Sequence, residues 1–387
     1  MISITELICL IRNMLGGGAE RVAATIVSNL PNTISRKLIT IYDSEIKYNI
    51  PEKPTTLLKY SSNKILRKIM LPFSILKNII ICKKEAPKIV LSFLDYDNIL
   101  NIITSIVCDY TAIISVHGVP SFQKSIYFGG ESIQKLLFSL AKIKGCPIIA
   151  VSQGIKDELI SDYKINSESI TILYNPIDIP TIQTLSSEDI YEKNIFNIPT
   201  IITVGSLAVA KGQWHLIRAF AELRHTHNAH LLILGEGGER QYLETLVDDY
   251  NLSENVYFMG WQENPYKYMS RATLFVSSSI SEALPNVLTE AMACGCPIIA
   301  SNCSQGVHEI IGDDDKNGLI ADKMSGIRYN ASAPLDKGER NLVELMKLVL
   351  DDENLQKSLS LNGKERANFF SVEVRMKEYE SFLRSYL

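Results

Sequence analysis

The chain has 387 residues, of which 46% are hydrophobic and 21% charged, and its formal net charge is −4. This length predicts two domains, and this composition excludes a disordered or fibrous chain. The most apolar region, residues 89–108, contains Asp95 and Asp97, so it lacks the run of about 20 nearly uncharged residues that a membrane-spanning helix needs. Glu6 stands where a secretory signal would carry basic residues.

The seven cysteines are scattered along the chain, and none of them forms a CxxC pair. Cys294 and Cys296 flank a single glycine, but no second pair of ligands follows nearby. Small buried residues are therefore favoured there over a metal site. This cysteine usage predicts a reducing, cytoplasmic compartment.

Short apolar, β-branched runs alternate with helical patterns along the whole chain. In the first half we expect strands at residues 6–11, 38–42, 89–93, 112–116, 148–151 and 170–173, and helices between them at 19–30 and 133–142. In the second half we expect strands at residues 201–204, 231–234, 256–259, 274–276 and 298–300, and helices between them at 214–223, 240–250 and 285–294. Strands that are apolar throughout are typical of parallel sheets covered by helices, so the pattern predicts doubly wound α/β domains.

The seam between the two halves falls at residues 175–180, Asn-Pro-Ile-Asp-Ile-Pro, and a polar stretch follows at 186–197. Prolines and Asx residues stop regular structure, which is typical of a hinge. We therefore expect an N-terminal domain at 1–180 and a C-terminal domain at 181–369. The last helical stretch, 370–387, could pack on either domain, and its periodicity does not decide between them.

Charge is distributed unevenly between the halves. Residues 1–180 contain 20 Lys and Arg against 15 Asp and Glu, whereas residues 181–387 contain 19 against 28. The basic excess is concentrated in residues 59–88, where eight basic residues accompany one acidic residue. A solvated helix face explains this run, and so does a face that docks on an anionic membrane, because apolar residues are interleaved at Leu66, Ile69, Met70, Leu71 and Phe73. Pro72 predicts an interrupted or kinked element rather than one long helix.

Ligands of open α/β sheets bind beyond the carboxyl ends of the strands, so residues that follow strands form the candidate site. The first such loop, Leu15–Arg21, places three glycines before a helix. Glycines allow close approach of the backbone to a ligand, and the free N–H groups at a helix start attract anions. A tight turn without a ligand also explains these glycines.

Lys211 and Gly212 open the helix that follows the first strand of the second half. A lysine at a helix N-terminus costs roughly 0.3–1 kcal/mol, and an anion such as a diphosphate removes that cost. A lysine that extends into water fits the same residues, so both interpretations stay open here.

Two carboxylates accompany the helix that starts near Pro285. Asn286 and Glu290 lie one turn apart on the same face, whereas Glu282 projects from the preceding loop. Carboxylates accept hydrogen bonds from hydroxyl groups, so a ribose and a sugar ring are suitable partners. The apolar run 291–294 favours a buried helix over a solvated acidic one.

Taken together, these segments resemble the retaining GT-B glycosyltransferases of family 4. The matching segments, in family order, are GGAERV at 17–22, His117 after a strand, NPID at 175–178, VGSLAVAKG at 204–212, LLILGEG at 231–237, VYFMGW at 256–261, SEALPNVLTEAMACGCPIIAS at 281–301 and GVHEII at 306–311. The resemblance covers nearly the whole chain, and its most specific part is the E-x7-E block from Glu282 to Glu290. It implies an α/β fold of two Rossmann-like, doubly wound domains, with a nucleotide-sugar donor bound in the interdomain cleft.

The resemblance also implies site residues. Glu290 is expected to bind the ribose, Lys211 the diphosphate, and Glu282 the transferred sugar. In the N-terminal domain, Gly17 and Gly18 are expected to face the phosphates, and His117 to contact the donor sugar near the reacting carbon. His117, Lys211 and Glu282 are the expected catalytic residues. The further donor-binding positions are Ser206, Gly260 and Trp261 (the last two beside the base), and the backbone cradle Ala283, Leu284, Pro285, Asn286 and Val287.

Two positions depart from the family pattern. Ser206 stands where the family often has arginine, so Lys211 is expected to carry more of the phosphate charge. Ala283 stands where the family often has glycine, which narrows the sugar pocket. Both departures bear on the identity of the donor rather than on the class of reaction.

The implied reaction is transfer of a hexose or N-acetylhexosamine from a UDP-sugar to a lipid-linked or polysaccharide acceptor. It needs no metal and no other cofactor, since Lys211 and helix N-termini stabilise the leaving diphosphate. We expect a cytoplasmic protein, peripheral on an anionic membrane surface if the basic segment docks there, and no nucleic-acid partner.

Three alternatives remain. A metal-dependent transferase could use Asp95-Tyr96-Asp97 or Asp313–Asp315 as its DxD motif, but it leaves the second set of βα units unexplained. A nucleotide-binding sensor without turnover fits the two departures, but not the presence of Lys211 and both glutamates. A phosphorylase is disfavoured because the chain is short and lacks a lysine set for a pyridoxal cofactor.

Overall fold

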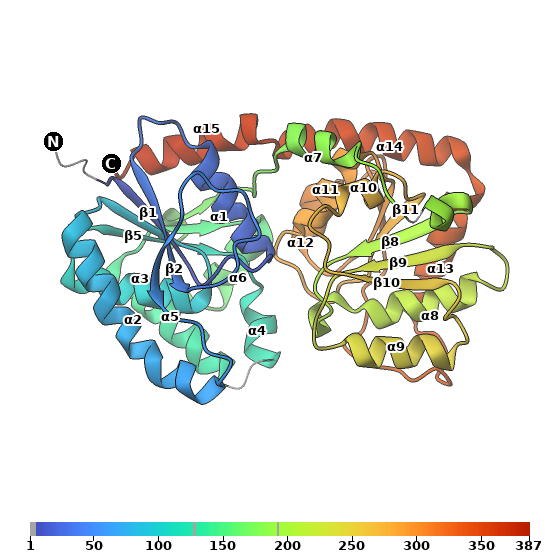
Figure 1. The fold of residues 1–387 in the computed structure, drawn as a ribbon, viewed down its shortest axis with the longest axis horizontal. Coiled ribbons are helices and arrows are strands. Elements are labelled where there is room, and N and C mark those ends of the chain that lie inside the picture. Colours follow the sequence, from blue (N-terminus) through green and yellow to red (C-terminus); the bar gives the residue numbers. More distant parts are fainter. Residues whose placement is uncertain (1–4, 127–128, 192) are drawn as a thin grey trace. The chain divides into compact units, whose positions relative to one another are not determined.

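The computed structural model describes residues 5–126, 129–191 and 193–387, apart from the side chains of residues 64–69, 71, 126 and 193. The described chain forms two compact α/β units (Figure 1). Unit 1 comprises the residues up to Pro176 together with Val372–Leu387, and unit 2 comprises Ile177–Ser371. The C-terminal helix therefore belongs to unit 1.

Unit 1 is built on a parallel sheet of seven strands in the order β3-β2-β1-β4-β5-β6-β7. The strands are β1 (Leu7–Ile11), β2 (Arg36–Tyr42), β3 (Thr55–Leu58), β4 (Ile89–Ser92), β5 (Thr111–Val116), β6 (Ile148–Ala150) and β7 (Ile170–Ile172). In the register, Leu7 of β1 pairs with Arg36 on one side and with Ile89 on the other. The strand order reverses between β1 and β4, so right-handed crossovers place the helices that follow these two strands on opposite faces.

All five residues of β1 are apolar and fully buried, so the strand has no solvent-facing side. A strand of this kind requires helices on both faces of its sheet. The helices of unit 1 are α1 (Gly18–Asn29), α2 (Lys64–Glu85), α3 (Asp95–Val107), α4 (Pro120–Ile126), α5 (Gly130–Lys144), α6 (Gln153–Ser161) and α15 (Val372–Arg384). From α15, Met376, Tyr379 and Leu383 complete the core around β1, and α15 contacts α1. The C-terminal segment thus supplies part of the core of unit 1.

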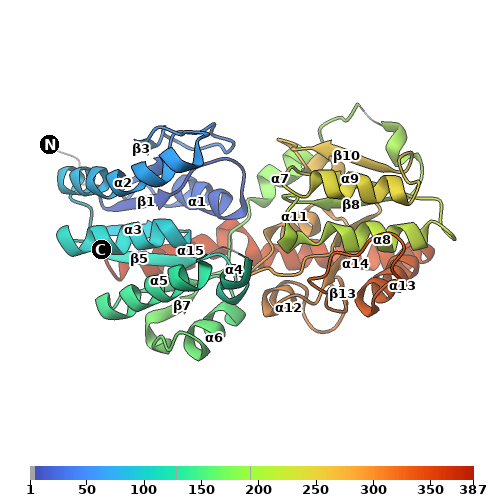
Figure 2. The same cartoon turned by 90° about the horizontal axis from the view of Figure 1, so that it is seen from below.

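Unit 2 repeats this plan with a parallel sheet of six strands in the order β10-β9-β8-β11-β12-β13. The strands are β8 (Thr200–Val204), β9 (His230–Leu234), β10 (Val256–Gly260), β11 (Leu274–Ser277), β12 (Ile298–Ser301) and β13 (Leu319–Ala321). Figure 2 shows β10 and β13 at the two edges of this sheet. The strand order reverses between β8 and β11.

The helices of unit 2 cover both faces of its sheet. They are α7 (Ile179–Ser186), α8 (Gln213–Leu223), α9 (Arg240–Asp249), α10 (Tyr266–Met269), α11 (Asn286–Cys294), α12 (Gln305–Ile311), α13 (Lys337–Asp351) and α14 (Glu353–Ala367). Figure 1 shows α8 and α9 on one side of the strands and α11 and α14 on the other. α13 packs on α8 and also contacts β11, β12 and β13, so these two helices lie side by side on the sheet. α14 packs on α11.

The predicted fold class is confirmed: the chain is α/β, with two Rossmann-like doubly wound units. Every expected strand is present, with bounds that differ by at most two residues. The edge strands β3 and β13 were not predicted, and two of the four residues of β3 are exposed. The expected interruption at Pro72 is wrong, since α2 is one continuous helix with Pro72 inside it. A proline removes a single N–H donor, and the other backbone bonds of this 22-residue helix remain available.

Candidate functional site

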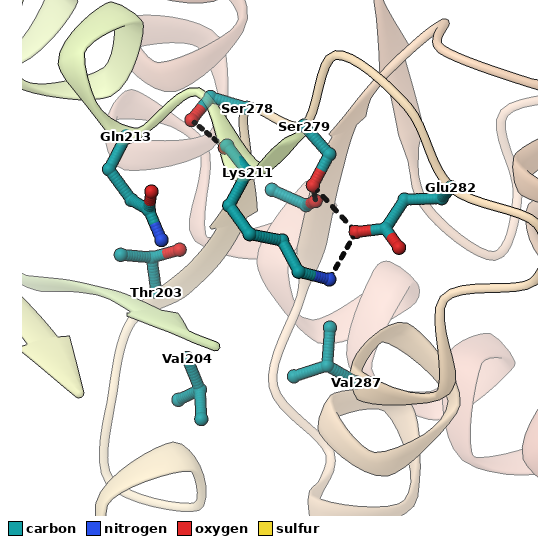
Figure 3. Close-up of a pocket in the computed structure, with 9 residues that line it drawn as sticks. Thr203, Val204, Lys211, Gln213, Ser278, Ser279, Glu282 and Val287 are labelled. Atoms are coloured by element: carbon teal, nitrogen blue, oxygen red, sulfur yellow. Dashed lines mark hydrogen bonds and ion pairs between the residues drawn. The ribbon is translucent and has the colours of Figure 1, made fainter. Parts of the chain in front are cut away.

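A polar pocket lies at the point of unit 2 where the strand order reverses, between β8 and β11 (Figure 3). Its lining comes from the carboxyl ends of these two strands, the loops that follow them and the first turns of α8 and α11. The lining residues are Thr203, Val204, Lys211, Gln213, Ser277, Ser278, Ser279, Glu282 and Val287. Ligands of doubly wound sheets bind at this topological switch point, so the pocket lies where the fold places a ligand site.

Lys211 and Glu282 meet inside this pocket. The Nζ atom of Lys211 lies 2.5 Å from Oε1 of Glu282, and the Ser279 hydroxyl donates to the same oxygen at 2.8 Å. Figure 3 shows the two charged side chains pointing toward one another, with Ser279 beside the carboxylate. The side chains are 26% and 13% exposed, so this ion pair is only partly solvated. Two residues that sequence reasoning assigned to the donor are thus brought together.

The lysine is held in place by Gly212, which has a left-handed backbone with φ of 56° and serves as the N-cap of α8. A Cβ atom at this position would lie 2.6 Å from the carbonyl oxygen of Ser278. The Ser278 hydroxyl in turn donates to the Gly212 carbonyl at 3.0 Å. Because both the conformation and the close approach require glycine, this position fixes the loop before α8 against the loop after β11.

Sequence reasoning missed the serines and the glutamine of this pocket. Ser277, Ser278 and Ser279 end or follow β11, and their hydroxyl groups bond to one another, to backbone and to Glu282. The amide nitrogen of Gln213 donates to the Ser206 carbonyl at 3.0 Å, while its buried oxygen has no hydrogen-bond partner among the described residues. Their position directly after a predicted strand was the signal that could have identified the serines.

The segment between Glu282 and α11 is closely packed. Ala283 and Leu284 are buried, and Pro285 is the N-cap of α11 rather than its first helical residue. A Cβ atom on Gly306 of α12 would lie 2.1 Å from the Ala283 carbonyl oxygen, so the cradle backbone and α12 are in direct contact.

The predicted residues of α11 differ in environment. Asn286 begins the helix, Val287 lines the pocket, and Glu290, one turn after Asn286, is buried with 4% exposure. Residues 288–294 are all buried, as the apolar run predicted.

Ser206, Gly260 and Trp261 lie at the same edge of the unit 2 sheet as the pocket. Ser206 follows β8 and is exposed, while Gly260 ends β10 with a φ of 67°. The N–H of Gly235, after β9, donates to the Gly260 carbonyl at 2.7 Å, which joins the loops after the two strands. Trp261 is 39% exposed.

In unit 1, Gly17 and Gly18 form the start of α1, directly after β1. Gly17 is the N-cap, and a Cβ atom there would lie 2.1 Å from the Glu20 carboxylate. The Tyr48 hydroxyl donates to the Gly17 carbonyl at 2.8 Å. Burial raises the pKa of Glu20. A carboxylate therefore lies beside the helix start at which the resemblance places the phosphates.

His117 follows β5, and its Nε2 atom lies 2.9 Å from the Ser115 hydroxyl. Its ring packs against Phe93, with 5.6 Å between the ring centroids. Burial lowers the pKa of His117 to about 3. The imidazole is therefore neutral at neutral pH and can offer a hydrogen bond but no positive charge.

The acidic residues of the metal-dependent alternative are engaged within the protein. Asp97 is fully buried in the first turn of α3, where it accepts the Arg12 backbone N–H at 2.8 Å. Burial raises the pKa of Asp97 to about 7, against the opposing effect of Arg12. Asp95 accepts the Gln134 amide at 2.7 Å. The enclosed carboxylate of Asp97 is therefore inaccessible to an exchangeable metal ion.

Two further acidic groups are also engaged in contacts within the protein. In the Asp313–Asp315 segment, Asp313 bonds to His308 at 2.9 Å and Asp314 pairs with Lys316 at 2.8 Å. Within the described part of the chain, the one group of three suitably spaced ligands is His215, Asp336 and Glu339. Both carboxylate oxygens of Glu339 already accept the Arg218 guanidinium, at 2.8 and 3.2 Å, so this group is a buried ion-pair network.

The two Rossmann-like units, together with the cation and the carboxylate at the switch point of unit 2, fit the GT-B class of glycosyltransferases. Residues 188–333 match the family described as Glycosyl transferases group 1. Over 358 residues, 92% of each chain, the protein is 32% identical to the N-acetylgalactosamine-N,N'-diacetylbacillosaminyl-diphospho-undecaprenol 4-alpha-N-acetylgalactosaminyltransferase of Campylobacter jejuni. It is 30% identical to an uncharacterised glycosyltransferase of Methanocaldococcus jannaschii, over 89% of this chain and 91% of that one.

A solved structure has the same fold. HepE of Anabaena in complex with UDP-glucose superposes with a TM-score of 0.81 at 18% identity, covering 98% of this chain and 99% of that chain. The chain therefore belongs to the group 1 glycosyltransferases and is an enzyme that transfers a glycosyl group. In the described residues, none of the helices combines the length and the hydropathy that crossing a membrane requires.

Proposed function

We propose that this enzyme transfers a hexose or N-acetylhexosamine from a UDP-sugar to a lipid-linked or polysaccharide acceptor. In this proposal it is a family 4 enzyme that retains the anomeric configuration and works without a metal ion. The observation that carries the proposal is the Lys211–Glu282 pair in the polar pocket at the switch point of unit 2. One pocket thereby offers a counter-charge for a diphosphate and an acceptor for sugar hydroxyl groups.

The two helix starts beside the pair support a role in stabilising the leaving diphosphate. Neither Gly212, before α8, nor Pro285, before α11, caps its helix with a side-chain hydrogen bond. Gln213 and Val287, in the first turns of these helices, line the pocket. Uncapped N–H groups at helix N-termini bind anions, so the chain supplies positive potential from its backbone as well as from Lys211.

The known relatives support the donor and the acceptor. HepE binds UDP-glucose, and the Campylobacter relative acts on a saccharide linked to diphospho-undecaprenol. A buried Glu290 near the same sheet edge is suited to a ribose, whose hydroxyl groups donate to a carboxylate. The roles of Gly17, Gly18 and His117 in unit 1, and those of Ser206, Gly260 and Trp261 in unit 2, remain predictions of the resemblance.

A nucleotide titration tests the donor. The protein, in excess EDTA, is titrated with UDP, GDP and ADP in a calorimeter, and UDP is expected to bind most tightly. Binding of GDP or ADP in preference to UDP would overturn the choice of base. A requirement for Mn²⁺ would overturn the metal-independent site. Once a sugar is identified, the coupling constant of the anomeric proton in the product reports retention or inversion.

We also propose that unit 1 docks on an anionic membrane surface through α2, beside a lipid-linked acceptor. On the described part of this helix, Phe73, Leu76 and Ile80 are 57–58% exposed and lie on one face. Lys77, Lys83 and Lys84 are exposed on the same helix. Each basic residue near an anionic surface contributes roughly 1 kcal/mol to binding. The structure does not describe the side chains of several residues in the earlier part of this segment, among them Lys64, Leu66, Arg67, Lys68, Ile69 and Leu71.

Vesicle co-sedimentation tests this docking. The native protein is expected to bind vesicles with acidic lipid at low salt and to be released at high salt. A variant with Lys77, Lys83 and Lys84 changed to glutamine should bind less. The charge-matched control changes three exposed lysines of unit 2, Lys316, Lys337 and Lys357, and should bind like the native protein. Equal loss in both variants would show a non-specific charge effect.

A further inference from the structure

We infer that Glu282 competes with the diphosphate of the donor for Lys211, and that this competition makes the enzyme bind a UDP-sugar more tightly than UDP. The inference rests on the proposed function and extends it to the release of the nucleotide product. Glu282 would then have two partners in turn: the Lys211 ammonium when a nucleoside diphosphate is leaving, and a sugar hydroxyl group when the intact donor is bound.

The contacts of Glu282 fix its carboxylate where it neutralises the lysine. One oxygen, Oε1, accepts from both Lys211 Nζ, at 2.5 Å, and the Ser279 hydroxyl, at 2.8 Å. Ser279 is itself held, because its carbonyl accepts the Ser301 hydroxyl and its own hydroxyl lies 3.2 Å from that of Ser277. The carboxylate is therefore positioned by a hydrogen-bonded support and not only by attraction to the lysine.

In this competition, the anion draws the Lys211 ammonium group away from Glu282. The Glu282 side chain is 13% exposed, so it cannot recover full hydration when the lysine leaves. It would remain negatively charged near an anionic diphosphate, and both effects oppose binding. A sugar hydroxyl group that donates to Glu282 replaces the lost partner. UDP has no such group at this position, so the opposing effect acts on the product and not on the donor.

The Lys211–Glu282 ion pair does more than hold two loops together. Gly212 and Ser278 hold the loop of Lys211 against the loop after β11 through a close backbone approach and the hydrogen bond of the Ser278 hydroxyl, neither of which involves Glu282. The ion pair is therefore not required to hold these loops together. What it does change is the charge that a ligand meets in the pocket.

Calorimetric titration with UDP tests the competition directly. Glu282→Gln keeps the shape of the side chain and removes its charge, and it is expected to bind UDP about tenfold more tightly than the native enzyme, or about 1.4 kcal/mol. The charge-matched control is Glu353→Gln, at an 84% exposed position on α14, which should bind UDP like the native enzyme. Unchanged or weaker UDP binding by Glu282→Gln would overturn the inference.

A double-mutant cycle shows whether the gain acts through Lys211. In a Lys211→Gln background, Glu282→Gln should no longer tighten UDP binding, because the competing cation is absent. An equal gain in that background would mean simple repulsion between Glu282 and the diphosphate, and the competition would be rejected. The ratio of the Kd for UDP to the Kd for the UDP-sugar should also fall in Glu282→Gln.

Inorganic pyrophosphate separates this inference from the proposed function. Pyrophosphate carries no base, and it is expected to bind and to respond to the two substitutions as UDP does. If the native enzyme binds neither UDP nor pyrophosphate, the proposed donor site and the inference both fail. If it binds them but Glu282→Gln gains nothing, the site stands and the inference alone is rejected.

Discussion

Lys211 is the residue whose substitution tests the proposed chemistry most directly. Its partner Glu282 keeps the hydrogen bond from Ser279 when the lysine is removed. Lys211→Met is therefore expected to lower the free energy of unfolding by about 1–2 kcal/mol, between the costs typical of exposed and of fully buried ion pairs. UDP binding should weaken by about 1.5–3 kcal/mol, the contribution of a hydrogen bond to a charged group. Urea unfolding and calorimetry measure the two quantities, and a large loss of stability with intact UDP binding would assign Lys211 a structural role.

The low pKa of His117 leads to a second prediction, on how stability and activity depend on pH. Burial lowers its folded-state pKa to about 3, below the value of about 6.5 in an unfolded chain. Below pH 6.5 the unfolded chain takes up a proton that the folded chain refuses, so this residue's contribution to stability falls as the pH is lowered. In His117→Asn that pH dependence should be weaker between pH 7 and 5, as measured by urea unfolding. The activity profiles of the two proteins should have the same shape over this range, and a His117-dependent step near pH 6 would contradict a neutral imidazole.

Single residues also show what sequence can and cannot supply. Lys211 and Glu282 could be identified because each follows a strand within its own motif. Their contact could not be predicted, since the two residues are 71 positions apart and periodicity gives no distances. Asp95 and Asp97 resembled a metal motif in the sequence, and only the burial of Asp97 and its bond to Arg12 show that this carboxylate is enclosed.

At the scale of elements, a buried ionic network joins α8 to α13. Glu339, in the first turn of α13, forms a capping box with Asp336 and accepts hydrogen bonds from both His215, at 2.8 Å, and Arg218. Arg218 also donates to the carbonyl oxygens of Asn330, Ala333 and Pro334, which fixes the loop before α13. The network stabilises α8, the helix that begins directly after Lys211 and Gly212.

Breaking this network should be costly. Glu339→Gln leaves the fully buried Arg218 without its carboxylate, and it is expected to lower the free energy of unfolding by about 3–5 kcal/mol. Glu244→Gln, which removes an exposed partner of Arg240, serves as the control and should cost less than about 1 kcal/mol. Urea unfolding compares the two variants, and equal effects would show that the buried network is dispensable.

The elements themselves were predictable where burial dictates the sequence. β1 and β4 are apolar along their whole length because helices cover both faces. The edge strand β3 lacks this continuous burial, since two of its four residues are exposed. Helix α2 continues through Pro72, although a proline typically predicts a break. The network of α8 could not be read from the sequence, since Arg218 and Glu339 are 121 positions apart.

At the scale of the whole molecule, the two sheets share the same order over six strands, and the predicted site residues follow strands of both sheets. In unit 1 these residues include Gly17 and His117, and in unit 2 they include Lys211 and Glu282. The repetition of the doubly wound plan could be predicted from the alternating strands and helices. The membership of the last helix could not, because α15 is amphipathic in either setting and only its packing on α1 assigns it to unit 1.

In the proposed function, this chain transfers sugar from a UDP-sugar without a metal ion, through Lys211. The most direct measurement is UDP release from UDP-N-acetylhexosamines and UDP-hexoses in excess EDTA, with vesicles that carry a diphosphate-linked saccharide as acceptor. We expect release from at least one donor that depends on the acceptor, persists in EDTA and falls by at least tenfold in Lys211→Met, as loss of about 1.4 kcal/mol of transition-state stabilisation requires. Acceptor-dependent release that appears only after Mn²⁺ is added, or that is unaffected by Lys211→Met, would contradict the proposed function.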